Sequence, residues 1–127
     1  MERTVTVGGK ELKMRASALI PRLYRFKFKR DMVADMRSLQ RAYAKASALP
    51  ENATDAERED AQFSVADLTI FENVAYIMAK HGGNEMPDTP EEWLDSIDGV
   101  FSIYEVLPVI LELWGMNMET TSIPKKK

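Results

Sequence analysis

The chain has 127 residues, of which 45% are hydrophobic and 29% charged, a balance typical of one globular domain that can bury a core. It contains no cysteine, which excludes a disulfide framework, a thiolate metal site and a cysteine nucleophile. No apolar run approaches the ~20 residues of a membrane-spanning helix, and the first residues do not resemble a secretory signal, so we expect no membrane association.

The charge of the chain is distributed unevenly. The net charge is −3, yet residues 1–48 carry a net charge of +8 and residues 49–124 a net charge of −14. A basic half can mark a nucleic-acid footprint. Alternatively, the two halves attract each other within one domain or between copies. We favour this second interpretation, because the acidic half would also repel phosphate.

The N-terminal stretch predicts a β-hairpin over residues 3–15. Val5 and Val7 alternate with threonines, and an apolar alternation resumes at Leu12 and Met14. Gly8-Gly9 between them supplies the positive φ angles of a two-residue turn. One face of this hairpin is apolar, and an isolated hairpin is marginal in water, so we expect it to pack on helices.

A helical region follows over about residues 19–48. Ser17 is the expected cap, and Leu23 and Phe26 are expected to face inward. Asp31 either restarts or continues the helix through Ala48, along a regular apolar stripe.

Five cations in the first part of this region form what we call the basic ridge: Arg22, Arg25, Lys27, Lys29 and Arg30. Aromatic residues interleave with them, as they do in nucleic-acid sites. The same pattern is found more often in amphipathic helices whose aromatic residues are buried and whose charges are solvated. We therefore treat nucleic-acid binding by residues 22–30 as the alternative.

Residues 54–81 are predicted to form one long helix at the centre of the fold. Thr54 and Glu57 have the spacing of a capping box, and His81-Gly82-Gly83 ends the stretch. Two adjacent rows of apolar residues run along it, so we expect it to be covered from two sides.

Two more helices are predicted, over about residues 90–98 and 100–114. Thr89-Pro90 marks the first, and Pro108 is expected to kink or divide the second, with Gly115 as its C-cap. Residues 116–127 are expected to form an extended, flexible tail. The prediction is thus a predominantly α member of the α+β class: a hairpin packed on four to five helices in a single domain, residues 1–115.

The search for reactive chemistry finds no candidate. The single histidine, His81, has no second histidine or cysteine to join it at a metal, and no serine has a base nearby in the sequence. Capping and solvation account for the carboxylates. We therefore expect no enzyme activity, no catalytic, cofactor-binding or metal-binding residues, and no cofactor.

Several segments in order resemble the tail assembly chaperone family of long-tailed phages and prophages of Gram-positive bacteria, and the likeness covers nearly the whole chain. The matching segments are residues 4–12, 21–31, 49–54, 75–79, 87–88, 92–95, 101–108 and 111–114, and the Pro-Lys-Lys-Lys end. None of them is a chemical motif. The specificity of the likeness lies in their order and number.

The resemblance implies a protein of the host bacterial cytoplasm that binds the tape-measure protein and keeps it soluble. Such a protein helps tail-tube subunits polymerise and is absent from the mature tail. It also implies a longer form made by ribosomal frameshifting, for which codons of Lys125–Lys127 are a candidate slippery sequence. It implies no catalytic residue and no cofactor.

A chaperone of this kind must cover apolar stripes reversibly, which calls for apolar surface with a charged rim. Flexible methionines suit such adaptable surfaces. The candidate contact residues are the basic ridge together with Trp114, Met116 and Met118. The sequence leaves self-association open.

Overall fold

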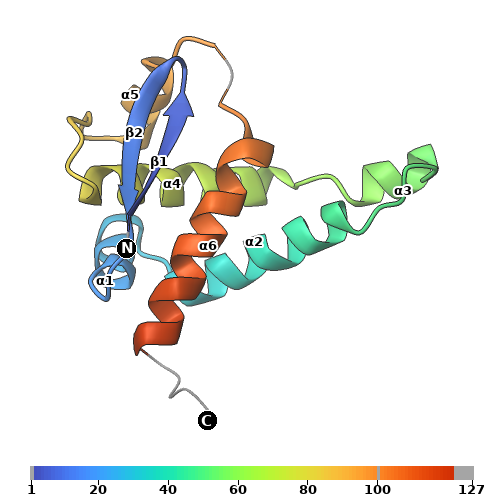
Figure 1. Ribbon diagram of the computed structural model, residues 1–127, viewed down its shortest axis with the longest axis horizontal. Helices are drawn as coiled ribbons and strands as arrows, with labels where there is room; N and C mark the ends of the chain where they lie inside the picture. Colours follow the sequence, from blue (N-terminus) through green and yellow to red (C-terminus); the bar gives the residue numbers. More distant parts are fainter. Residues whose placement is uncertain (1, 100, 122–127) are drawn as a thin grey trace.

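The computed structural model describes residues 2–99 and 101–121, with side chains described through residue 115 (Figure 1). The described residues form two strands and six helices: β1 (Glu2–Val7), β2 (Lys10–Arg15), α1 (Ile20–Phe28), α2 (Met32–Ser47), α3 (Asp55–Asp60), α4 (Val65–His81), α5 (Pro90–Asp95) and α6 (Ile103–Thr121). The predicted class, α+β and predominantly helical with an N-terminal hairpin, is confirmed. The helices are more numerous than predicted, because one expected helix is divided.

The hairpin has the predicted two-residue turn. β1 pairs antiparallel with β2, with Val7 opposite Lys10, and Gly8 and Gly9 take φ angles of 58° and 79°. Val5, Val7 and Met14 are buried, so the alternation does place one face on the core. A Cβ on Gly8 would lie 2.9 Å from the carbonyl oxygen of Asp98, because the turn packs closely against the chain after α5.

Helix α4 is the centre of the fold, as its two apolar rows predict. It contacts β2, α1, α2, α5 and α6. In Figure 1 the hairpin and α6 cross α4, α5 lies above it, and α1 and α2 lie below it. Eight of its residues are buried, among them Phe71 and Tyr76. Phe71 stacks on Phe101, which meets Trp93 of α5 edge to face, so aromatic contacts join these elements.

The prediction of one continuous helix over residues 54–81 is wrong. The capping box of Thr54 and Glu57 is present, but it starts only the short helix α3, which ends at Asp60. A second capping box starts α4: the Ser64 hydroxyl accepts from the Asp67 amide at 3.0 Å, and the Asp67 carboxylate accepts from the Ser64 amide at 3.3 Å. The second box competes with helix continuation and separates the two helices.

The expected extended tail from residue 116 is also wrong as far as Thr121. Helix α6 is a single assigned helix to Thr121, so Gly115 lies inside it and is not its C-cap. Pro108 lies inside the same helix without dividing it into two. The rest of the expected tail, residues 122–127, falls outside the described residues.

The region of residues 19–48 forms two helices rather than one continuous helix. Lys29 takes a φ of 59° at the end of α1, and the Asp31 carboxylate caps α2 by accepting from the Val33 amide at 3.0 Å. Ser17 is not the side-chain cap of α1. Its hydroxyl accepts from the amide of Leu19, just before the helix, at 3.3 Å and lies 2.8 Å from Nε2 of His81.

Candidate functional site

Helix α1 has one buried face and one solvent-facing face. Ile20 and Tyr24 are buried, and Leu23 and Phe28 pack against the core. The opposite side carries what we call the outer face of α1: Arg22, Arg25, Phe26 and Lys29. These residues follow the spacing of one helical stripe.

Phe26 is exposed, which corrects the expectation that it faces inward. Its exposed fraction is 78%, because burial of Ile20 and Tyr24 sets the rotation of the helix. The Lys29 ammonium lies 4.9 Å from the centroid of its ring. A large aromatic side chain in water between cations leaves apolar surface that a partner could cover.

The five cations of the basic ridge do not share one environment. The Lys27 ammonium donates to the carbonyl of Asp88 at 2.9 Å and lies 5.5 Å from the ring centroid of Tyr76. Lys27 therefore ties α1 to the chain before α5. The guanidinium groups of Arg22 and Arg25 make no hydrogen bond or ion pair with the residues that the structure describes.

Arg30 also belongs to the fold. It donates two hydrogen bonds of 2.8 Å to the carboxylate of Asp35, which accepts a third, of 2.7 Å, from the Tyr24 hydroxyl. Burial of Asp35 raises the pKa of its carboxyl, but these donors outweigh it and lower the pKa below its ordinary value. The pair closes the corner between α1 and α2, so Arg30 is not free to recognise a partner.

A groove of about 510 Å³ lies beside the outer face, where α1 meets the start of α2. Its walls are Pro21, Arg25, Lys29, Arg30, Asp31, Met32 and Val33. Val33 is 37% exposed, so the groove offers apolar as well as basic surface. Phe26, Val33 and the cations together provide an amphipathic surface suited to a partner helix.

The structure does not place the other predicted contact residues on this surface. Trp114 is only 4% exposed and belongs to the core, so it is unavailable to a partner in this structure. Met116 and Met118 lie in the last turns of α6, and their side chains are outside what the structure describes. Of the predicted set, the outer face brings together Arg22, Arg25 and Lys29.

A second apolar area near the start of α4 was not predicted as a surface. Tyr104 is 62% exposed and meets the ring of Phe63 at a centroid distance of 5.7 Å. Val65 and Leu68 on α4 are exposed by 81% and 38%. Leu68 belongs to one of the two apolar rows that predict a doubly covered helix, so it was expected to be buried. Its exposure depends on which helices cover α4, and no local pattern reports that.

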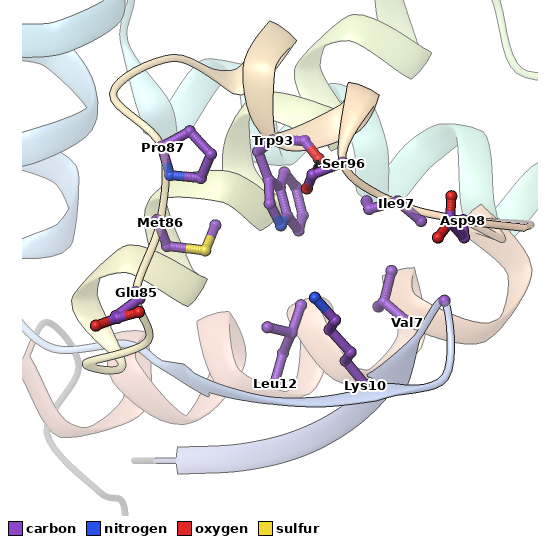
Figure 2. A pocket seen from close by; sticks show the side chains of 11 residues that line it. Val7, Lys10, Leu12, Glu85, Met86, Pro87, Trp93, Ser96, Ile97 and Asp98 are labelled. Carbon is purple, nitrogen blue, oxygen red and sulfur yellow. Dashed lines mark hydrogen bonds between the residues drawn. The ribbon is translucent and has the colours of Figure 1, made fainter.

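A small crevice lies between the hairpin turn, residues 85–87 and α5 (Figure 2). Figure 2 shows Trp93 and Met86 on one side of it and Lys10 and Leu12 on the other. Its volume is about 110 Å³, below the roughly 300–1,000 Å³ of sites that hold small organic ligands. The crevice is therefore a poor candidate for a substrate or cofactor site.

One serine and one histidine meet in space, which sequence order could not reveal. Ser17 Oγ and Arg15 Nη1 lie 2.8 and 3.3 Å from Nε2 of His81. Burial lowers the pKa of His81, and the charges of Arg15 and the N-terminus lower it further. Among the described residues no carboxylate bonds to the imidazole, as one would in a catalytic triad. The contact joins the end of the hairpin to the end of α4.

Two further searches cover only the described part of the chain. No group of three histidine, aspartate or glutamate side chains there could hold a metal ion. No helix there is long and apolar enough to cross a membrane. Comparison with known proteins found no matching family model, no matching curated protein and no matching solved structure.

Proposed function

We propose that this protein is a tail assembly chaperone of a long-tailed phage or prophage. It binds the tape-measure protein in the host bacterial cytoplasm and assists assembly of tail-tube subunits without catalysis and without entering the mature tail. The order of matching segments along the chain suggests the family. The observation that carries the binding role is Phe26, 78% exposed among cations on the outer face of α1.

The chemistry of this face defines the partner that it fits. Covering one aromatic side chain contributes roughly 1.5–3 kcal/mol, enough for reversible binding when several such contacts act together. Arg22 and Arg25 lie on the same face and would meet acidic residues at the edge of the partner's apolar stripe. A tape-measure segment that forms an amphipathic helix with acidic flanks satisfies both requirements.

The same proposal includes two further partners. Tail-tube subunits would meet the chaperone while it is bound to the tape-measure protein. A frameshifted longer form of this chain would share the residues before the slip, and therefore the same outer face.

Co-expression with the tape-measure protein tests the proposal. The wild-type chain should keep that protein soluble and co-purify with it. Replacement of Arg22 and Arg25 by glutamate should reduce co-purification at an unchanged thermal midpoint. A fall in the thermal midpoint that matches the loss of binding would assign these residues to the fold instead.

A small nucleic-acid-binding regulator is the second candidate function. The observation that favours it is the exposed ring of Phe26 beside Lys29, because bases stack on aromatic side chains within basic surfaces. A gel shift that weakens steeply with salt and requires Phe26 would support this candidate. Binding of the tape-measure protein with no gel shift would support the chaperone.

A further inference from the structure

The second apolar area, at the start of α4, forms what we call the α4–α6 patch: Phe63, Val65, Leu68 and Tyr104. Tyr104 lies in the first turn of α6 and meets the ring of Phe63 edge to face at a centroid distance of 5.7 Å. Val65 and Leu68 lie one turn apart on α4 and are exposed by 81% and 38%. Tyr104 is 62% exposed, so three large apolar side chains at this end of α4 face water.

The charged residues beside this patch are acidic. The sequence has no lysine or arginine in residues 59–79 or 81–124. Glu72 follows Leu68 by about one turn of α4, so the two share one side of the helix. Glu105 lies in the first turn of α6 and is exposed, while Glu72 is partly buried. The patch therefore has carboxylates at its edges.

The basic helix α2 does not neutralise these two carboxylates. Ser38 of α2 donates to the Asp67 carboxylate at 3.1 Å, which places α2 beside Asp67. Asp67 is two residues after Val65, so it lies about 200° around α4 from the patch. Within the part of the chain that the structure describes, no ion pair reaches either carboxylate at the edge of the patch.

Glu72 in particular lacks a partner for its charge. Burial raises the pKa of its carboxyl, and no hydrogen bond or cation among the described residues opposes that effect. A cation on another molecule would supply the missing partner. Apolar residues beside that cation would cover Val65 and Leu68, and burial of apolar surface favours binding.

We propose that the α4–α6 patch is a second docking site, whose occupant is an amphipathic helix of another protein with lysine or arginine along the edges of its apolar stripe. The stripe covers Val65, Leu68 and Tyr104, and the cations meet Glu72 and Glu105. The outer face of α1 carries cations instead and lies below the other end of α4 (Figure 1). The chain thus holds two helices of opposite edge charge at separate places.

Two labelled peptides of leucine and lysine, equal in composition, test the proposal by fluorescence anisotropy at about 0.1 M salt. The first has leucine at helical spacing, so that lysines flank one apolar stripe. The second has the same residues in an order that forms no stripe. The wild-type chain should bind the first peptide about tenfold more tightly or better. Equal affinities, or no binding, would overturn the proposal, because charge attraction alone does not depend on residue order.

Backbone amide resonances locate the site on the wild-type chain without any substitution. Addition of the first peptide should shift the resonances of residues 63–72 and 101–105 in a nitrogen–proton correlation spectrum. The resonances of α1 should stay in place. Shifts that cluster on α1, or that spread evenly over the chain, would overturn the proposal even if every variant failed to fold.

The apolar part of the contact is tested by replacing Val65 and Tyr104 with serine, which leaves the net charge unchanged. This double variant should bind the first peptide about tenfold more weakly or worse. Leu19→Ser is the matched control, because Leu19 is 47% exposed but precedes α1. It should keep the affinity of the wild type. An equal loss in the control would overturn the proposal.

The charged part is tested by Glu72→Lys with Glu105→Lys. The lysine peptide should no longer shift the resonances of the patch, and a peptide with glutamate in place of lysine should shift them. Glu11→Lys with Glu85→Lys makes the same change in net charge at exposed positions. This control should keep the preference of the patch for the lysine peptide. The same preference in both variants would contradict the assigned carboxylates.

This inference goes beyond the tape-measure partner, since the experiment contains only the chain and synthetic peptides. Its outcome is therefore independent of co-purification through the outer face of α1. If serine at positions 65 and 104 abolished contact between copies of the chain and left peptide binding unchanged, the patch would belong to a second copy. That result would also overturn the proposal.

Discussion

The carboxylate of Asp35 accepts two hydrogen bonds of 2.8 Å from the guanidinium of Arg30. Asp35 is 5% exposed, so this pair fixes the corner between α1 and α2 from inside the molecule. Arg25, five positions earlier, makes no such contact within the described chain. Two arginines that look alike in the sequence therefore have different roles, which separate variants can distinguish.

Replacing Arg30 by alanine should lower the free energy of unfolding by about 2 kcal/mol, because the buried carboxylate loses its charged partner. Replacing Arg25 by alanine should change it by less than about 0.5 kcal/mol, as expected for an exposed side chain. Urea unfolding of both variants measures the difference. Equal losses of unfolding free energy would contradict the ion pair of Arg30 with buried Asp35 and the solvent-exposed position of Arg25.

The lowered pKa of Asp35 predicts that the fold loses stability in acid. Its pKa in the folded chain lies below the ordinary value of 3.8, so the unfolded chain binds the proton more readily. The pair therefore stabilises the fold above about pH 4, and its contribution should be lost as the pH falls through and below that value. The stability difference between wild type and Asp35→Asn, measured by urea unfolding from pH 7 to pH 3, should shrink. A difference that grows towards acid would contradict this sign.

The lowered pKa of His81 predicts a change in the stability of the fold at milder pH. Its pKa lies below the ordinary 6.5, so the fold prefers the neutral imidazole and stability should fall as the pH decreases through about 6.5. In a His81→Gln variant this fall in stability near pH 6.5 should disappear. The loss of stability caused by protonation of Asp35 in stronger acid should remain. Thermal midpoints of the two chains between pH 8 and pH 5 would show it. Parallel curves would mean that the contact with Ser17 does not depend on the neutral ring.

Two glycine substitutions test the C-terminal end of α4 and the interior of α6. A Cβ on Gly82 would lie 2.0 Å from the carbonyl oxygen of Lys13, which is backbone and cannot turn aside. Gly82→Ala should therefore cost more than about 3 kcal/mol in unfolding free energy. Gly115→Ala is the control: apart from the neighbouring backbone of its own helix, no described residue comes within 4 Å of a Cβ placed there, and the residue is inside α6. That substitution should be neutral or stabilise by up to about 1 kcal/mol.

A loss of stability from Gly115→Ala would return this glycine to the C-cap role that the sequence suggested. The prediction was wrong because helix α6 continues through Gly115 to Thr121. A glycine at the end of a periodic apolar stretch is a common stop signal, but tertiary contacts can override it. The core position of Trp114 holds this part of the helix against its neighbours.

Replacing Phe26 is expected to weaken binding of the partner without lowering the stability of the fold. Phe26→Ala should leave the thermal midpoint nearly unchanged, because the side chain is 78% exposed, and should weaken co-purification with the tape-measure protein about tenfold or more. Phe71→Ala is the matched control, because that ring is 2% exposed and its loss should cost roughly 3–5 kcal/mol. A large loss of stability from Phe26→Ala would mean that the ring is buried after all.

Local signals were enough for the hairpin and for two helix starts. Gly8-Gly9 between alternating residues indicates one turn geometry, and Thr54 and Thr89 have capping chemistry that depends only on neighbours in sequence. The division between α3 and α4 was missed although Ser64 and Asp67 carry a signal of the same kind. The apolar row that begins at Phe63 continues into α4, so its spacing does not show where that helix starts.

The candidate surface was predicted only in part, since burial and contacts are tertiary properties. No sequence pattern distinguishes Arg30, paired with a carboxylate beneath α1, from Arg25 on its outside. The inward orientation predicted for Phe26 failed because the packing of Ile20 and Tyr24 sets the rotation of the helix. Ser17 and His81 meet across 64 positions of sequence. Contacts of this kind become visible only when the chain is folded.

The most direct test of the binding role is co-expression of the tape-measure protein with three forms of this chain. They are the wild type, the variant with Arg22→Glu and Arg25→Glu on the outer face, and a variant with Arg37→Glu and Arg41→Glu on α2. The last two variants make the same change in net charge at exposed positions. We expect the tape-measure protein to be soluble and bound with the wild type and the α2 variant, and insoluble with the outer-face variant. Equal solubility with all three forms, or none with the wild type, would contradict the account.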